Sequence, residues 1–130
     1  MAKHPEVAPA LLCKTKQEFL RKLHQIEPYA KRAQVDIMDN RFVPNKTVQP
    51  AEFRGLKTRV KLEMQLMVKN PSDYIFDCCR MGAWMIIFHY ESIKDAENIK
   101  TCINHIRTHK IKVGRRMARF ARSIPTPSPR

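Results

Sequence analysis

The sequence predicts an α+β fold in which a three-stranded antiparallel sheet is packed by two helices. Two observations support this prediction. Apolar and polar residues alternate from Thr58 to Val68, which is the period-2 pattern of a strand with one buried face. After Ser92, apolar residues recur every three or four positions as far as Lys110, which is typical of an amphipathic helix.

Three consecutive strands make up the predicted sheet. The first follows the alternation and ends at the turn-forming run 69–73, where Pro71 fixes φ and its polar neighbours bond their own backbone. Residues 74–79 form the second strand, and residues 80–82 are few enough to close a hairpin. The third strand, residues 83–90, is apolar on both faces. The expected arrangement is therefore an antiparallel meander, which needs a helix to cover it.

Two helices are expected to pack on this sheet. The first spans residues 15–27, because Thr15 and Glu18 form a capping box and Pro28 stops regular helix soon afterwards. The second spans residues 92–110, with Ser92 as its N-cap. Burial of six apolar residues should dominate the stability: Leu62, Leu66, Ile86, Phe88, Ile99 and Ile103.

The chain is expected to divide into an extended arm, a single domain and a tail. The arm covers residues 1–14, the α+β domain 15–110, and the basic tail 111–130, which ends in alternating prolines. Within the domain, residues 33–38 read as a short strand. A long loop follows at 39–56, and its aromatic residues indicate that it contacts the domain.

Composition narrows the possible partners. The 130 residues contain 25 Lys plus Arg against 12 Asp plus Glu, a net charge of +13. Such an excess in a small chain favours a polyanionic partner, most often nucleic acid.

No apolar run approaches the ~20 residues of a membrane span, and the N-terminus lacks a secretory signal. We therefore expect no transmembrane segment, no secretion, and four reduced cysteines that serve mainly as core residues.

Motifs for catalysis or cofactor binding are scarce. His105 and His109 lie four residues apart on a predicted helix, but the Glu and the third ligand of a metal site are missing. The acidic residues of the strands and loops show no pairing in the sequence: Asp36, Asp39, Asp73 and Asp77. There is no glycine-rich phosphate loop and no nucleophile elbow. We therefore expect that the protein is not an enzyme and that it binds no cofactor, no metal and no small-molecule substrate.

The basic tail gives the clearest functional prediction. Residues 111–130 contain no acidic residue, and Arg115, Arg119 and Arg122 are spaced so that a helix over 113–123 would place them on one face. Arginine binds phosphate bidentately, and clustered cations need a polyanion to relieve their repulsion. RNA phosphates are therefore expected to bind five residues of the tail: Lys112, Arg115, Arg116, Arg119 and Arg122.

Four short segments are similar to a known family of RNA-binding proteins. Gln17-Glu18-Phe19 opens the first helix, Lys57-Thr58-Arg59-Val60 leads into the sheet, and Ile87-Phe88 precedes Lys94-Asp95-Ala96. With the order helix, three strands, helix, about half of the chain resembles the small Alu-domain subunits of the signal recognition particle. Those subunits fold as α-β-β-β-α and bind RNA on the sheet. Further RNA contacts are expected at Lys57 and Arg59.

The basic α+β style is also similar to many mitochondrial ribosomal proteins. We therefore expect a non-catalytic, RNA-binding structural subunit of a large ribonucleoprotein, first of all a mitochondrial ribosome. RNA and the neighbouring subunits of the assembly are the expected partners. The alternatives are an Alu-domain-type subunit of the signal recognition particle and a basic accessory subunit of a mitochondrial membrane complex. The mitochondrial matrix is the favoured compartment, with the cytoplasm as the alternative.

Overall fold

The computed structural model describes residues 8–93 and 95–115. Strands alternate with α-helices along this part of the chain except between β2 and β3, and three single turns of 3₁₀ helix, η1 to η3, lie in the connections. In chain order the elements are β1 Ala10–Leu11, α1 Lys16–Ile26, β2 Arg32–Met38, η1 Pro50–Glu52, β3 Lys61–Met67, η2 Pro71–Tyr74, α2 Ile75–Met81, β4 Met85–Phe88, η3 Tyr90–Ser92, α3 Ala96–Thr108 and β5 Lys112–Arg115.

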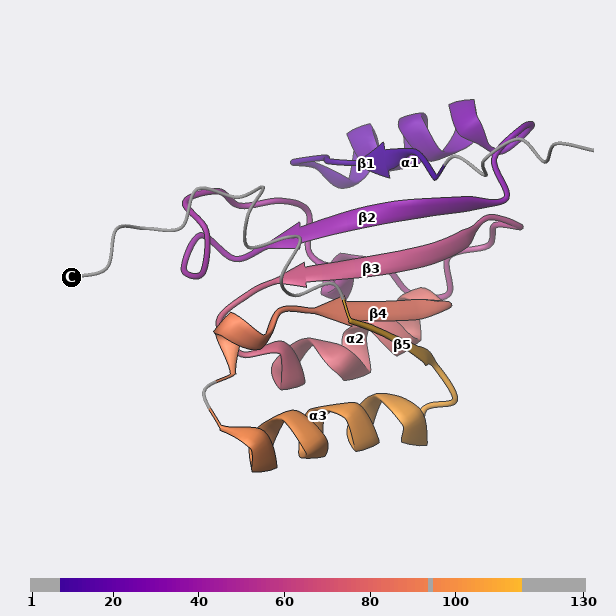
Figure 1. Ribbon diagram of the computed structural model, residues 1–130. Coiled ribbons are helices and arrows are strands. Elements are labelled where there is room, and N and C mark those ends of the chain that lie inside the picture. Colours follow the sequence, from indigo (N-terminus) through magenta and orange to yellow (C-terminus); the bar gives the residue numbers. More distant parts are fainter. Residues whose placement is uncertain (1–7, 94, 116–130) are drawn as a thin grey trace, which may run out of the picture.

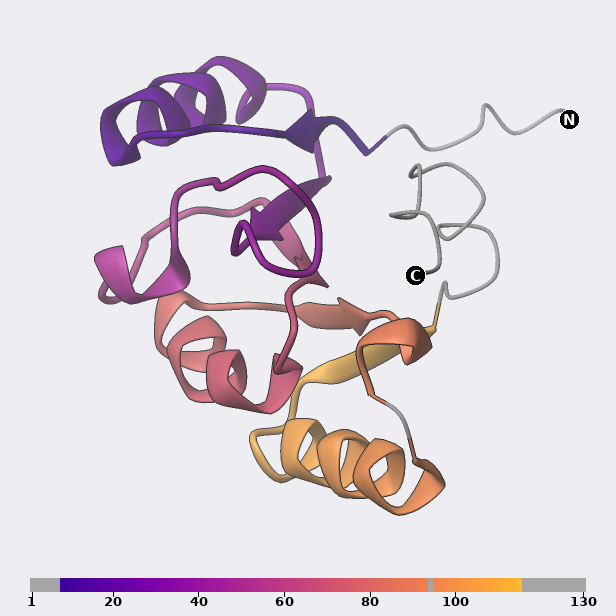
Figure 2. The same ribbon diagram turned by 90° about the vertical axis from the view of Figure 1, so that its left-hand side faces the viewer.

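The five strands form one parallel sheet in the order β1-β2-β3-β4-β5 (Figure 1). Parallel neighbours need a crossover connection between them. Helices α1, α2 and α3 supply it after β1, β3 and β4, and a long irregular segment connects β2 to β3. The sheet is curved, and all three helices lie on its outer side (Figure 2). The fold class is therefore α/β.

The expected antiparallel meander is wrong, and the error arises at residues 74–79. The sequence there was expected to form a strand, but the structure has helix α2. Ile75, Cys78 and Met81 lie three residues apart and are all fully buried, so a single helical stripe accounts for the apolar residues of this segment. Once this segment is a helix, β3 and β4 lie parallel instead of forming a hairpin.

The second predicted helix begins later than residue 92. Ser92 belongs to η3, and the side chain of Asp95 caps α3 by accepting from the Asn98 amide at 2.8 Å. The first predicted helix is confirmed as α1, where Thr15 accepts from the Glu18 amide at 3.1 Å. The strand expected at residues 33–38 is present as β2.

Both ends of the described chain join the sheet. Ala10–Leu11, within the predicted arm, pairs with β2, and Lys112–Arg115, within the predicted tail, pairs with β4. The helix expected over 113–123 is therefore wrong for Val113, which lies in a strand, and its remainder beyond residue 115 falls outside the described residues. The division of the chain at residues 14 and 110 stays a prediction.

The hydrophobic core lies between the sheet and its helices. Alternate residues of the strands point into it, so Val35, Leu66 and Phe88 are almost fully buried together with Phe19 of α1. Four of the six predicted core residues are buried: Leu62, Leu66, Ile86 and Phe88. The other two, Ile99 and Ile103, are partly buried and pack against the core.

The long segment after β2 is tied to the loop after β3. The Asp39 carboxylate accepts from the backbone amides of Arg41 at 2.8 Å, Phe42 at 2.9 Å and Lys69 at 2.8 Å. Phe53 packs on Phe19 with ring centroids 4.9 Å apart, which confirms that the segment contacts the domain. These bonds fix the connections at the carboxyl edge of the sheet.

Candidate functional site

The sheet face that points away from the helices carries polar side chains on two neighbouring strands, β2 and β3, and on the residue after β4. A strand that alternates sends every second residue to this inner face. The residues concerned are Arg32, Gln34, Asp36 and Met38 of β2, Glu63, Gln65 and Met67 of β3, and Met85 and Ile87 of β4. His89 follows β4 with an extended backbone. It therefore continues the alternation of β4, and its side chain belongs to the same inner face as those of Met85 and Ile87.

An ion pair occupies the amino-terminal side of this face. Arg32 Nη1 lies 3.2 Å from Glu63 Oε2, and Glu63 is only 4% exposed. A buried carboxylate needs such a partner, because an isolated charge is costly to remove from water. Glu63 therefore has a structural partner on its own side of the sheet.

A hydrogen-bond relay of neutral side chains crosses the middle of the face. The Gln34 amide nitrogen donates to Gln65 Oε1 at 2.6 Å, and the Gln65 amide nitrogen lies 3.5 Å from His89 Nε2. Gln65 is 3% exposed and His89 is 1% exposed. We call Gln34, Gln65 and His89 the relay. It joins β2, β3 and the residue that follows β4 through side chains that are far apart in the sequence.

Asp36 lies beside the relay, and the sheet register pairs it with Gln65. Desolvation raises the pKa of the Asp36 carboxyl to about 6. Within the described residues Asp36 makes no hydrogen bond or ion pair. A half-buried carboxyl with a pKa near neutrality can take up and release a proton, which makes it a candidate acid–base group.

His89 is held in its neutral form. Burial lowers its pKa to about 4, so it carries no charge at neutral pH. The Phe42 ring stacks over the imidazole, with centroids 6.2 Å apart and planes 27° apart. His89 is therefore a neutral hydrogen-bonding group in a covered position.

The donor set of this face does not fit a metal ion. Among the described residues, no group of three or more His, Cys, Asp or Glu side chains could hold one. The face instead combines Asp36 and His89 with two amides, which are weak ligands for transition metals, and its other carboxylate, Glu63, is paired with Arg32. His105 and His109 of α3 have ring centroids 5.3 Å apart but meet no third ligand in this part of the chain.

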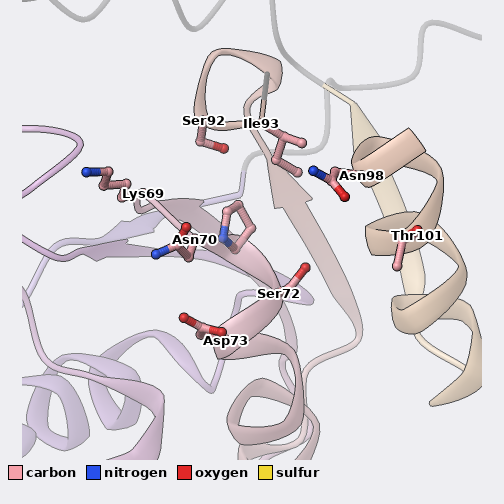
Figure 3. A pocket seen from close by; sticks show the side chains of 9 residues that line it. Lys69, Asn70, Ser72, Asp73, Ser92, Ile93, Asn98 and Thr101 are labelled. Carbon is pink, nitrogen blue, oxygen red and sulfur yellow. The ribbon is translucent and has the colours of Figure 1, made fainter. Parts of the chain in front are cut away.

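A polar cavity of ≈ 420 Å³ lies between the segments that follow β3 and β4 and helix α3 (Figure 3). The loop after β3 contributes Lys69 and Asp73, the loop after β4 contributes Ser92, and helix α3 contributes Asn98 and Thr101. None of the inner-face residues lines this cavity. The cavity is therefore separate from Asp36 and the relay, which together we call the acid–base cluster.

The predicted RNA-binding residues lie away from the relay or outside the described chain. Lys112 and Arg115 lie in β5, and Lys57 and Arg59 are in the segment before β3. The remaining three fall beyond residue 115: Arg116, Arg119 and Arg122. The contacts of the described residues do not test the RNA-binding role expected for these side chains.

The sequence did not reveal Asp36, Gln34 or Gln65 as site residues. Its alternation contained the signal, because Arg32, Gln34 and Asp36 recur two apart in a strand whose other residues are apolar. A period-2 polar stripe in a strand normally faces water. Its meaning changed only when the parallel order placed the stripe of β2 beside that of β3.

The part of the chain that the structure describes contains no helix with the length and apolar character of a membrane span.

Comparison with known proteins gives a consistent result. The Ribulose-phosphate 3 epimerase family matches residues 6–121. The chain is 35% identical over 111 residues to the ribulose-phosphate 3-epimerase of Treponema pallidum, which covers 83% of this chain and 50% of that protein. The cytoplasmic isoform of Oryza sativa is 37% identical over 82 residues, covering 62% of this chain and 35% of its own length. The Synechocystis enzyme is 33% identical over 94 residues, covering 70% and 41%.

These comparisons overturn the functional expectations drawn from the sequence. The three relatives are named as epimerases, which are enzymes acting on a sugar phosphate, and none of the three is a ribosomal or signal recognition particle protein. The non-catalytic ribonucleoprotein subunit is therefore wrong, and so are the signal recognition particle and membrane-complex alternatives. The expectation of RNA as partner and of no small-molecule substrate is also wrong. The chain spans about half the length of the curated relatives it matches, or less.

Proposed function

The chain belongs to the ribulose-phosphate 3-epimerase family, and from this premise we propose that it supplies the base-bearing half of a sugar-phosphate epimerase. A parallel sheet with all its helices on one side is the arrangement of an α/β barrel wall. Such barrels place their active sites at the carboxyl ends of the strands. The acid–base cluster around Asp36 lies on the inner face of the corresponding wall, which is the observation that supports the proposal.

The name of the relatives defines the chemistry that a base must perform. Inversion at C3 of a ribulose phosphate begins with removal of the C3 proton, which is acidic because C2 is a carbonyl carbon. The electron pair of the C3–H bond moves into the C2–C3 bond, and the C2 oxygen gains the negative charge of an enediolate. Return of a proton to the opposite face of C3 completes the inversion. The reaction needs a base with a pKa near the working pH and a donor for the C2 oxygen.

Asp36 has the properties that this base requires. Its pKa of about 6 leaves it ionised at neutral pH, yet basic enough to accept a proton from carbon in a supported transition state. Glu63, the other carboxylate of the face, is engaged with Arg32 and lies two residues earlier along β3 than the partner of Asp36. Among the described carboxylates of the inner face, we therefore assign Asp36 as the base that removes the C3 proton.

We assign the remaining functions of the reaction to groups outside this wall. Inversion needs a second acid on the other face of C3, and among the described residues the inner face offers no second free carboxyl. In α/β barrels the phosphate is frequently bound after strands 7 and 8, whereas residues 8–115, apart from 94, form a sheet of five strands. The proposed proton abstraction is carried by the Asp36 carboxylate itself.

The experiment is hydrogen exchange at C3 in deuterium oxide. The chain is incubated at neutral pD with millimolar ribulose 5-phosphate, and the C3–H signal is followed by proton NMR. We expect the wild-type chain to exchange this proton and Asp36→Asn to lower the rate by about 100-fold or more. Asp73→Asn, the same change at an exposed position, should exchange at the wild-type rate. Absence of exchange in the wild type, or full exchange in Asp36→Asn, would contradict the proposal.

A further inference from the structure

We propose that Gln65 supplies the hydrogen-bond donor for the C2 oxygen of the substrate, and that Gln34 and His89 hold its amide in the required orientation. This inference rests on the proposed function and deepens it, because it assigns the group that stabilises the enediolate. It also defines the ligand class of the site, which is a planar oxyanion recognised by a neutral amide.

The relay fixes the Gln65 amide at both ends. Its oxygen accepts from the Gln34 amide at 2.6 Å, and its nitrogen lies 3.5 Å from His89 Nε2. His89 is neutral, so its Nε2 can accept a hydrogen bond when the ring proton is on Nδ1. A half-turn of the amide would lose the contact with Gln34, and it would keep the contact with His89 only if the ring proton moved to Nε2. With the proton on Nδ1 the amide is therefore held in one orientation, which is what a preorganised donor needs.

The strand register gives the direction in which the amide points. Gln34 pairs with Glu63, two residues before Gln65, so the amide oxygen faces the amino end of the sheet. His89 lies two residues after Ile87, the partner of Gln65, so the amide nitrogen faces the carboxyl end. An amide nitrogen carries two hydrogens, and His89 takes one. The other is left for a ligand at the end of the sheet where barrel active sites lie.

The position of Gln65 also suits the substrate. Asp36 is its direct partner in the sheet register. The C3 proton and the C2 oxygen belong to adjacent carbons, so a base and an oxyanion donor must be close neighbours to serve both. A neutral amide can act as this donor, as amide side chains do in other oxyanion-binding sites.

The first test is the tautomer of His89, read from nitrogen-15 chemical shifts of its ring in the full chain at pH 7. The relay requires the proton on Nδ1 and a bare Nε2. In Gln65→Glu the carboxylate still accepts from Gln34 but offers His89 an acceptor, so the proton should move to Nε2. A proton on Nε2 in the wild type would mean that the relay runs in reverse, with the amide oxygen toward the carboxyl end, and would overturn the proposal.

The second test measures oxyanion binding without catalysis. Glycolohydroxamate, a planar oxyanion that resembles an enediolate, is titrated calorimetrically with EDTA present to remove trace metal. We expect Gln65→Glu and Gln65→Met to bind it at least ~10-fold more weakly than the wild type, since each lacks the donor. Gln25→Glu, the same change at an exposed position of α1, should bind as the wild type does. The melting temperature of Gln65→Met, which has similar volume, checks that the fold is retained.

The C3 exchange assay separates this proposal from the function it rests on. Gln65→Glu should lower the turnover number of exchange by about 10²–10³-fold, with a smaller effect on KM. If the wild type exchanges through Asp36 and Gln65→Glu does so equally fast, the donor assignment fails and the proposed function stands. Equal hydroxamate binding by the wild type and both Gln65 variants would also overturn the assignment.

Discussion

Asp36 and His89 share the inner face of the sheet, and burial moves their pKa values in opposite directions. The pKa of Asp36 rises from 3.8 to about 6, so the folded chain holds this proton more tightly than the unfolded chain. Its contribution to stability is present below about 3.8 and is lost as pH rises through 6. The pKa of His89 falls from 6.5 to about 4, so its contribution is present above 6.5 and is lost as pH falls through 4. The two dependences offset each other over most of the range between pH 4 and 6.5.

Single substitutions should therefore reveal slopes that the wild type conceals. Of the two groups only His89 titrates in Asp36→Asn, so relative to the wild type its free energy of unfolding should fall by about 1–2 kcal/mol from pH 6.5 to 4.5. Only Asp36 titrates in His89→Gln, so relative to the wild type its free energy of unfolding should rise by a similar amount over the same interval. Urea unfolding at the two pH values measures both. If both variants followed the wild-type pH dependence, the burial of these two groups would have to be reconsidered.

At the scale of single residues, the sequence indicates that the site residues lie in strands, but it does not indicate which residues lie beside them. Gln34 and Gln65 are 31 positions apart, and their hydrogen bond exists only because β2 and β3 are adjacent and parallel. A local pattern shows that Asp36 lies in a strand, but it does not show which strand lies beside it. The pKa of Asp36 depends on burial by the assembled sheet, so the sequence alone could not identify it as a base.

At the scale of the elements, one helix decided the fold class. The strands β2 and β3 and helix α1 followed from period-2 and capping patterns that act within a few residues. Residues 75–81 form only two turns, and a segment that short fits a buried strand as well as a helix. The difference lies in Gly82, which ends α2 in the left-handed region with φ of 99°. Reading it as part of a hairpin turned a parallel α/β sheet into an antiparallel one.

The cap at Gly82 can be tested directly. Gly82→Ala should lower the free energy of unfolding by about 1 kcal/mol, because a Cβ is unfavourable at this positive φ. The cost is conformational, since the nearest atom to an added Cβ is the Leu56 carbonyl oxygen at 3.8 Å. Gly82→Asn should cost less, because asparagine tolerates the left-handed region better. Thermal unfolding compares the three chains; an alanine variant as stable as the wild type would contradict the left-handed cap.

For the whole molecule, net charge was the least specific of the sequence signals. A charge of +13 attracts anions in general, and it does not distinguish an RNA from a sugar phosphate. The subcellular localisation, with the mitochondrial matrix favoured over the cytoplasm, stays a prediction. The molecule has a curved sheet whose edge strands β1 and β5 each pair with one neighbour among the described residues. An α/β barrel closes such edges with further strands. We therefore expect inversion at C3 to require groups from outside this sheet.

The pH dependence of C3 exchange tests the central claim most directly. The wild-type chain is incubated with ribulose 5-phosphate in deuterium oxide across about pH 4.5 to 8, and the exchange and the C3 epimer are read from the same NMR spectra. The rate should rise with pH through a midpoint near 6, where Asp36 loses its proton, and then level off. Little epimer should form, because the inner face offers no second free acid among the described residues. A rate without this midpoint, or no exchange at any pH, would contradict the assignment of Asp36 as the base.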